Sequence, residues 1–315
     1  MSLDARAKAE ALHDQALALE GQDDDTALQL YHEALLLDAN RPETLYNIGL
    51  IHKYRSAWAL SLDYNRRAVA LAPDDEAANW NLAIAATALH EWREARNTWR
   101  RLGIDVALGD EPIQSDFGRA LVRLNPNDSG EVVWGRRVCP VRLRIENVPL
   151  PDSGYRCGDL VLHDGASTGR RTSGGREYMV FNALMLHRAS KLTTFTLEAE
   201  VATPQDLEAL MSALETAGFE GEDWTSSVHA LCKACSEGRP HEHHDEACEE
   251  QAWQPQRSLG VAALAEGPLM ATLRAWEQTS AGRCRVLALA AALLPPGQQA
   301  GAEHSAWRNR AFGAP

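Results

Sequence analysis

The chain has 315 residues, which is long for one ordinary domain and favours two or three. Its apolar fraction of 45% is normal for globular folds, and its net charge of −13 disfavours nonspecific binding to nucleic acid or anionic membranes. The N-terminal stretch lacks the apolar core of a signal peptide, and the longest apolar run, at residues 286–294, is too short for a membrane span. We therefore expect a cytoplasmic protein whose six cysteines are thiols or metal ligands rather than disulfides.

The N-terminal third of the chain repeats at a fixed interval, about 34 residues, which is a length typical of stacked helical hairpins. Three sets of positions recur at this interval: Ala27, Ser61 and Ala95; Ala34, Ala68 and Leu102; and Ile48-Gly49 with Leu82-Ala83. One helical hairpin cannot bury its own apolar face, and small residues at fixed positions let the next hairpin approach closely. The period predicts three helix-turn-helix units. The alternative is an irregular helical bundle with accidental periodicity.

This pattern resembles the tetratricopeptide repeat (TPR) family, which has Leu-Gly in the first helix of each repeat and small residues in the second. Pro73 matches the inter-repeat proline of the family, whereas Ala39 replaces it one repeat earlier, and Asp14-Gln15 replaces Leu-Gly in the first unit. We expect the helical domain to cover residues 1–126 and to end in a capping helix at residues 113–126, which Pro126 terminates.

The resemblance implies a concave groove, lined by the first helix of each repeat, that holds a protein or peptide partner. The clamp of Lys, Asn and Arg that binds chaperone tails in this family is matched in type by Asn47 alone, so a chaperone tail is not the expected ligand. We expect Asn47 and Asn81 to hydrogen-bond a peptide backbone, and Leu50 and Ile84 to make apolar contacts. The alternative is that the protein's own capping segment fills the groove.

Residues 127–191 have a different composition, with alternating apolar and polar runs between Gly and Pro residues. Such runs at residues 141–148, 158–165 and 174–181 predict short strands of a small antiparallel sheet or barrel. His163 and Asp164 are expected in a turn. Residues 134–191 contain ten Arg or Lys and only five Asp or Glu. This local positive charge fits contact with RNA phosphates, but a solvated or internally paired face is the simpler interpretation.

Residues 192–296 contain two similar halves. The segments 204–218 and 268–282 each open with Pro and close on Ala-Gly, which is typical of helix boundaries, and Thr203 is placed to cap the first of them. Strand-like runs at residues 194–201, 224–231, 258–264 and 284–293 flank these helices. The order strand, helix, strand, twice over, predicts a ferredoxin-like module, followed by a tail at residues 297–315.

A loop at residues 232–248, between the two halves, is rich in Cys and His. Zinc prefers four thiolate or imidazole ligands, and a C-x2-C pair followed by His and Cys at short range supplies them. We expect a structural Cys3His zinc site from Cys232, Cys235, Cys248 and either His241 or His244. A redox dithiol, a loosely binding loop and a loop without metal are the alternatives. Cys139, Cys157 and Cys284 lie in apolar runs and are expected to be buried thiols.

These features favour a bacterial-type α+β multidomain adaptor: a TPR solenoid, a β-rich middle segment and a ferredoxin-like module that carries a zinc loop. The first alternative function is an RNA- or ribosome-associated factor that uses the basic β segment, and the second is a metal-dependent hydrolase. A closed four-ligand zinc site leaves no position for a substrate, and no nucleotide-binding or nucleophile motif is present, so the sequence favours a protein that is not an enzyme.

Overall fold

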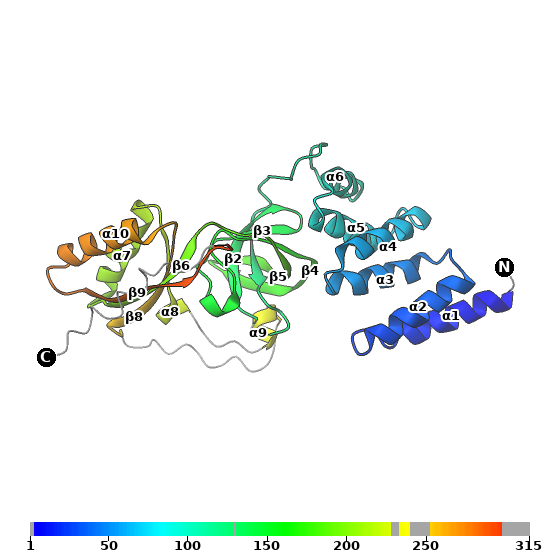
Figure 1. Ribbon diagram of the computed structural model, residues 1–315, viewed down its shortest axis with the longest axis horizontal. Helices are drawn as coiled ribbons and strands as arrows, with labels where there is room; N and C mark the ends of the chain where they lie inside the picture. Colours follow the sequence, from blue (N-terminus) through cyan, green and yellow to red (C-terminus); the bar gives the residue numbers. More distant parts are fainter. Residues whose placement is uncertain (1–2, 129, 228–232, 240–252, 298–315) are drawn as a thin grey trace. The chain divides into compact units, whose positions relative to one another are not determined.

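The computed structural model in Figure 1 describes residues 3–128, 130–227, 233–239 and 253–297. The chain folds as two compact units, of which the first comprises Met1–Ser115 with Cys139–Val141 and the second comprises Asp116–Val138 with Arg142–Pro315. The first unit is helical and the second contains two sheets, so the expected α+β class is confirmed. No helix in the described part of the chain combines the length and the apolar character that crossing a lipid bilayer requires.

The helical unit consists of helices that pack as successive hairpins. Their bounds are α1 Leu3–Leu17, α2 Asp24–Leu37, α3 Pro42–Tyr54, α4 Trp58–Leu71, α5 Glu76–Ala88 and α6 Trp92–Arg101. The starts of α2, α4 and α6 are separated by one constant interval, and the same interval separates both the starts and the ends of α3 and α5. The predicted period is therefore present in the helix bounds themselves.

Close helix packing explains the small residues of the repeat. Ala27, Ser61 and Ala95 are fully buried. Ser61 also donates a hydrogen bond of 2.8 Å to the carbonyl oxygen of Gly49, and a Cβ added at Gly49 would lie 2.5 Å from Nδ2 of Asn65. Helices α3 and α4 therefore approach too closely for any larger residue at position 49 without rearrangement.

The predicted capping helix at residues 113–126 is wrong. That segment is extended and then forms strand β1, Arg119–Arg123, in the second unit. The end of the helical unit is instead covered by the extended chain after α6, whose carbonyls at Ala107, Glu111 and Pro112 accept hydrogen bonds from the Arg96 guanidinium at 2.5–3.2 Å. A side chain thus satisfies the backbone of this extended segment, and the boundary lies at Ser115 rather than at Pro126.

The predicted β-rich segment is a closed barrel. Its strands are β1 Arg119–Arg123, β2 Val132–Cys139, β3 Arg142–Ile145, β4 Leu160–Ser173 and β5 Arg176–Arg188. Strand β1 pairs antiparallel with β2 and parallel with β5, which joins the two ends of the sheet. Apolar side chains at alternate positions fill the interior, for example Val122, Leu124 and Val133.

The second sheet contains β6 Thr193–Glu200, β7 Glu220–Asp223, β8 Gln256–Ala263 and β9 Arg285–Leu293, in the order β7-β8-β6-β9 with every neighbouring pair antiparallel. Helices α7, Pro204–Thr216, and α10, Glu266–Thr279, pack on one face of it (Figure 1). The predicted cap is confirmed, since Thr203 accepts a hydrogen bond from the Asp206 backbone at 3.2 Å.

One predicted strand is wrong. The segment Trp224–Ser227 is a helical turn, α8, and β7 precedes it. Trp224 donates from Nε1 to the carbonyl oxygen of Val148 at 2.8 Å, and its ring lies over Gly260, where an added Cβ would overlap it. The indole thus fills the space between the second sheet and the loop before β4, and this packing outweighs the strand propensity of the segment.

Candidate functional site

The residues predicted to line a peptide groove are mostly internal. Asn47 donates to the hydroxyl oxygen of Tyr31 at 2.9 Å, and Oδ1 of Asn81 accepts from Nζ of Lys53 at 3.2 Å. Both asparagines are buried, and Ile84 is 1% exposed, whereas Leu50 stays partly exposed. Three of the four side chains are therefore used within the helical unit.

A hollow between α4 and α6 is a more open feature of the helical unit. It has a volume of about 700 Å³ and an apolar floor that includes Val69 and Leu82. Exposed residues on both helices border it, among them Ala70 on α4 and Asn97 on α6. Its volume and apolar floor suit an inserted side chain of a polypeptide.

Of the predicted zinc ligands, Cys235 alone belongs to the described residues. Cys232, His241, His244 and Cys248 lie outside them. The described residues contain no group of three or more His, Cys, Asp or Glu side chains that is placed to share a metal ion.

Helix α9, Lys233–Glu237, carries Cys235 and is docked on strand β4. Arg171 donates to the carbonyl oxygen of Cys235 at 2.7 Å, Thr168 donates to that of Glu237 at 2.9 Å, and the Arg170 backbone donates to that of Gly238 at 3.0 Å. The backbone at Gly169 lies so close to this segment that an added Cβ would be 2.3 Å from the oxygen of Gly238. A polar and tightly fitted contact therefore fixes the position of Cys235.

The remaining described cysteines are buried thiols, as expected. Cys139, Cys157 and Cys284 are each at most 5% exposed, and burial raises the pKa of Cys157 to about 12. A thiol with so high a pKa is not a nucleophile at neutral pH.

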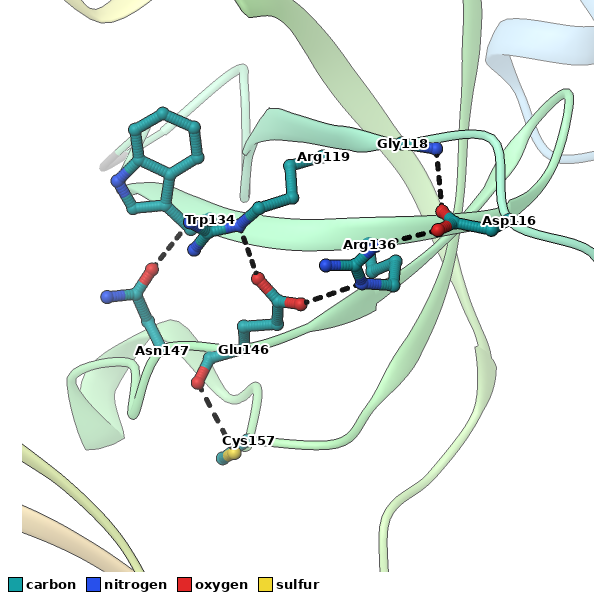
Figure 2. A network of polar contacts seen from close by, with 8 residues as sticks. All are labelled: Asp116, Gly118, Arg119, Trp134, Arg136, Glu146, Asn147 and Cys157. Carbon is teal, nitrogen blue, oxygen red and sulfur yellow. Dashed lines mark hydrogen bonds and ion pairs between the residues drawn. The ribbon is translucent and has the colours of Figure 1, made fainter. Parts of the chain in front are cut away.

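Arginines of the barrel are held by acidic partners (Figure 2). Glu146 accepts from Arg119 at 2.8 Å and from Arg136 at 3.4 Å, and Arg136 also donates to Asp116 at 2.9 Å. The Arg119 guanidinium lies 4.9 Å from the centroid of the Trp134 ring. These contacts engage the cationic groups within the protein's own surface.

The other arginines singled out in the sequence show the same tendency. Arg170 pairs with Glu177 at 3.1 Å, Arg171 is half-buried against α9, and Arg137 lies over the ring of Phe181. Arginines paired in this way have fewer free donors for phosphate groups. Their arrangement does not favour the RNA-binding alternative.

His163 lies in strand β4 rather than in a turn, so that expectation is wrong. Its ring is fully buried, with its centroid 4.4 Å from that of Phe181. Burial lowers the pKa of His163 to about 3, with a further contribution from the charge of Arg137. The imidazole is therefore neutral at physiological pH and packs as part of the barrel interior.

A larger cavity lies in the second unit and was missed by sequence reasoning. It has a volume of about 770 Å³, and its walls include Arg123 at the end of β1, Glu131 just before β2, Leu150 and Trp224. Arg123 is 5% exposed although it is charged, and Nε of its guanidinium has no hydrogen-bond partner among the described residues. The sequence signal was an arginine at the end of the apolar run of residues 120–122, which by itself is ambiguous.

Glu131 is the second unusual group of this cavity. Its Oε1 accepts from the backbone of Leu150 at 3.0 Å, and the Ser153 side chain also lies near the carboxylate, which is largely buried. Burial, together with the nearby charge of Glu222, raises the pKa of Glu131 to about 7. A carboxyl that is half ionised near neutral pH marks this cavity as a functional candidate.

The fold and these sites define a two-unit α+β protein with a repetitive helical unit and a cavity-bearing β unit. No protein-family model matches the chain, and no curated protein matches its sequence.

Proposed function

We propose that the protein is an interaction adaptor whose helical unit is a TPR-type solenoid that binds a polypeptide partner. The observation that carries this proposal is the recurrence of the helix bounds at a constant interval, with fully buried small residues at the same interval. Solenoids of stacked hairpins present extended surfaces that suit polypeptide binding. The strand order β7-β8-β6-β9 with two β-α-β halves supports a ferredoxin-like assignment for the C-terminal module.

The hollow between α4 and α6 is the binding surface that we favour. Asn47 already donates to Tyr31, and Asn81 is 4% exposed with its Oδ1 accepting from Lys53, so neither side chain is accessible to a peptide backbone. The hollow instead offers exposed Ala70 and Asn97 around a buried apolar floor. An anchor side chain of a partner would bury apolar surface there.

The repeat itself provides a matched control for a test. Ala70 on α4 corresponds to Leu36 on α2, one repeat earlier, and both are exposed. A peptide library displayed on phage, selected on the full-length protein, should enrich sequences that bind wild-type protein and Leu36→Glu but not Ala70→Glu. The charge at position 70 should weaken binding by about tenfold or more, because a partner side chain seated on the apolar floor beside it would desolvate it.

Two outcomes of this selection would contradict the proposal. One is that no peptide family is enriched on the folded protein. The other is that the enriched peptides bind Ala70→Glu as well as they bind Leu36→Glu.

We also propose that zinc ties together residues 232–248, with Cys232, Cys235, Cys248 and either His241 or His244 as ligands. The support is the ligand spacing in the sequence and the firm docking of Cys235 on β4. A thiolate that is held in place before the metal arrives reduces the entropy lost when the site forms.

A further inference from the structure

We propose that the protein forms a symmetric homodimer in which the edge strand β9 of one copy pairs antiparallel with β9 of a second copy. This interface goes beyond the proposed adaptor function, because it lies in the second unit and uses no residue of the helical unit. Three features of the second sheet lead to this partner: an unprotected edge, an apolar core that is half-covered beside it, and a helix flank whose charges complement themselves.

The two edges of the second sheet have different characters. Strand β7 forms one edge and has four residues, three of them acidic, and its Glu222 accepts a hydrogen bond from the Val148 backbone at 2.9 Å. Strand β9 forms the other edge and has nine residues, with neither proline nor a charged side chain after Arg285. In the described part of the chain, β6 alone pairs with it. Sheets protect long edges with charge, proline or a covering segment, so an edge without them suits pairing with another strand.

The apolar core under helix α10 is incomplete at the β9 edge. Leu289 and Ala291 of β9 pack against this core, as do their ladder partners Leu197 and Phe195. The β6 residues are at most 2% exposed, whereas Leu289, Ala291 and the neighbouring Met270 of α10 stay partly exposed. A second copy brings both a strand and a helix to this side, so it covers all three side chains, which a single added strand would not.

One flank of α10 faces the outer side of the sheet. Oε1 of Glu277 accepts a hydrogen bond of 2.6 Å from the backbone N–H of Val286 in β9, and Met270 lies on the same flank, seven residues earlier. The opposite flank faces α7, because Nε1 of Trp276 donates to the carbonyl oxygen of Asp206 at 3.1 Å. The flank with Glu277 and Met270 is therefore the one that a partner copy would meet.

The charges of this flank complement themselves under a two-fold rotation. Glu266 lies four residues before Met270 and Arg274 four residues after it, so the three side chains share one side of the helix. Arg274 is exposed and Glu266 is partly exposed. When two copies of α10 run antiparallel with Met270 at the axis, Glu266 of each copy faces Arg274 of the other, which gives two ion pairs.

The same axis passes near the middle of β9. From Glu277 back to Met270 the helix advances about 10 Å, and from Val286 to Leu289 the strand advances about 10 Å in the same direction. Met270 therefore lies at the level of Leu289, within the residues 288–291 that pair regularly with β6. One two-fold axis thus serves the strand layer and the helix layer together, as an isologous interface requires.

Sedimentation velocity of the full-length protein tests the proposal. Wild type should sediment as a dimer at micromolar concentrations and dissociate on dilution. Ala291→Lys should weaken dimerisation by about tenfold or more, because its ammonium group would be enclosed between the two copies. Ala290→Lys is the matched control: Ala290 is exposed on the face of the sheet away from the helices, so this variant should remain a dimer.

A charge exchange on α10 tests the position of the axis. Arg274→Glu should weaken dimerisation by about tenfold, because it replaces both attractions in the dimer by repulsions. The double variant Glu266→Arg with Arg274→Glu should recover most of that loss. This comparison keeps the test decisive even if circular dichroism shows that Ala291→Lys does not fold.

Wild type that stays monomeric at every concentration would overturn the proposal. The same conclusion would follow from a dimer that Ala290→Lys weakens as strongly as Ala291→Lys does, from one that Arg274→Glu leaves unchanged, or from a double variant that recovers nothing. None of these results bears on the phage selection, which concerns the helical unit.

Discussion

Individual polar residues of this protein take their roles from burial rather than from their type. Asn47 resembles a groove residue in the sequence but is bonded to Tyr31, and Arg123 resembles an ordinary surface charge but is 5% exposed. Glu131 has a largely buried carboxylate. Because the folded state changes how readily Glu131 is protonated, the free energy of unfolding depends on pH.

At the residue scale, Glu131 predicts a specific pH dependence. Because the folded state raises the pKa of Glu131 from 4.5 to about 7, its contribution to the free energy of unfolding is fully present below about pH 4.5. That contribution is lost as the pH rises through about 7, since the folded state then has to ionise a buried carboxyl.

Chemical denaturation of wild type and Glu131→Gln across this range measures the effect. The stability of the variant relative to wild type should increase by on the order of 2 to 3 kcal/mol between the two ends of the range, since one pKa unit corresponds to about 1.4 kcal/mol. The exposed Glu177→Gln serves as control and should track wild type at every pH. A pH-independent difference between wild type and Glu131→Gln would show that burial of this carboxyl does not control its ionisation.

Short elements of this fold are fixed by their neighbours. Helix α9 has five residues, too few for a stable isolated helix. It depends on hydrogen bonds that Arg171, Thr168 and Arg170 of β4 donate to carbonyl oxygens of α9 and of Gly238, which follows it. Strand β1, likewise five residues long, replaces the expected capping helix because β2 and β5 satisfy its backbone on both sides.

The zinc prediction belongs to this scale, because a metal bound by Cys235 would tie His241 or His244 and Cys248 to α9 and, through α9, to strand β4. Purified, untagged protein should contain about one zinc per chain, as one tetrahedral site allows. Cys235→Ser should lose most of this zinc and lower the unfolding temperature of the second unit, since metal binding and local folding share one free energy. Elemental analysis and a thermal melt measure the two effects.

Cys284→Ser is the matched control, because it removes a buried thiol of the second sheet that is no candidate ligand. It should keep its zinc whatever its effect on stability. Protein without zinc, or Cys235→Ser with its zinc retained, would count against the site.

At the scale of the whole molecule, the helical unit should fold separately. Residues 1–115 contain helices α1 to α6 and the extended segment bound by Arg96, and they exclude strand β1. The isolated fragment should give a helical circular dichroism spectrum and one cooperative thermal transition, because its contacts are between neighbouring hairpins. A disordered spectrum would mean that the helical unit depends on the rest of the chain, including Cys139–Val141.

The helical repeat and the halves of the C-terminal module were predictable from the sequence because their signals are local and periodic. Ala27, Ser61 and Ala95 recur at the interval of a hairpin, and Thr203 caps α7 through a residue only three positions away. The closure of the barrel and the strand at Arg119–Arg123 were not predictable, because β1 is completed by β5, a partner strand that comes much later in the chain.

The sequence by itself determined the period of the helices, the strand and helix order of the second module, and the cysteine and histidine spacing that suggests zinc. Tertiary structure alone decided which polar groups are buried. Arg123 and Glu131 line the same cavity as Trp224, which is distant from both along the chain. No local sequence pattern predicts that these three residues line one cavity. Desolvation depends on everything that surrounds a side chain, so the raised pKa of Glu131 and the burial of Arg123 arise only when distant segments pack together.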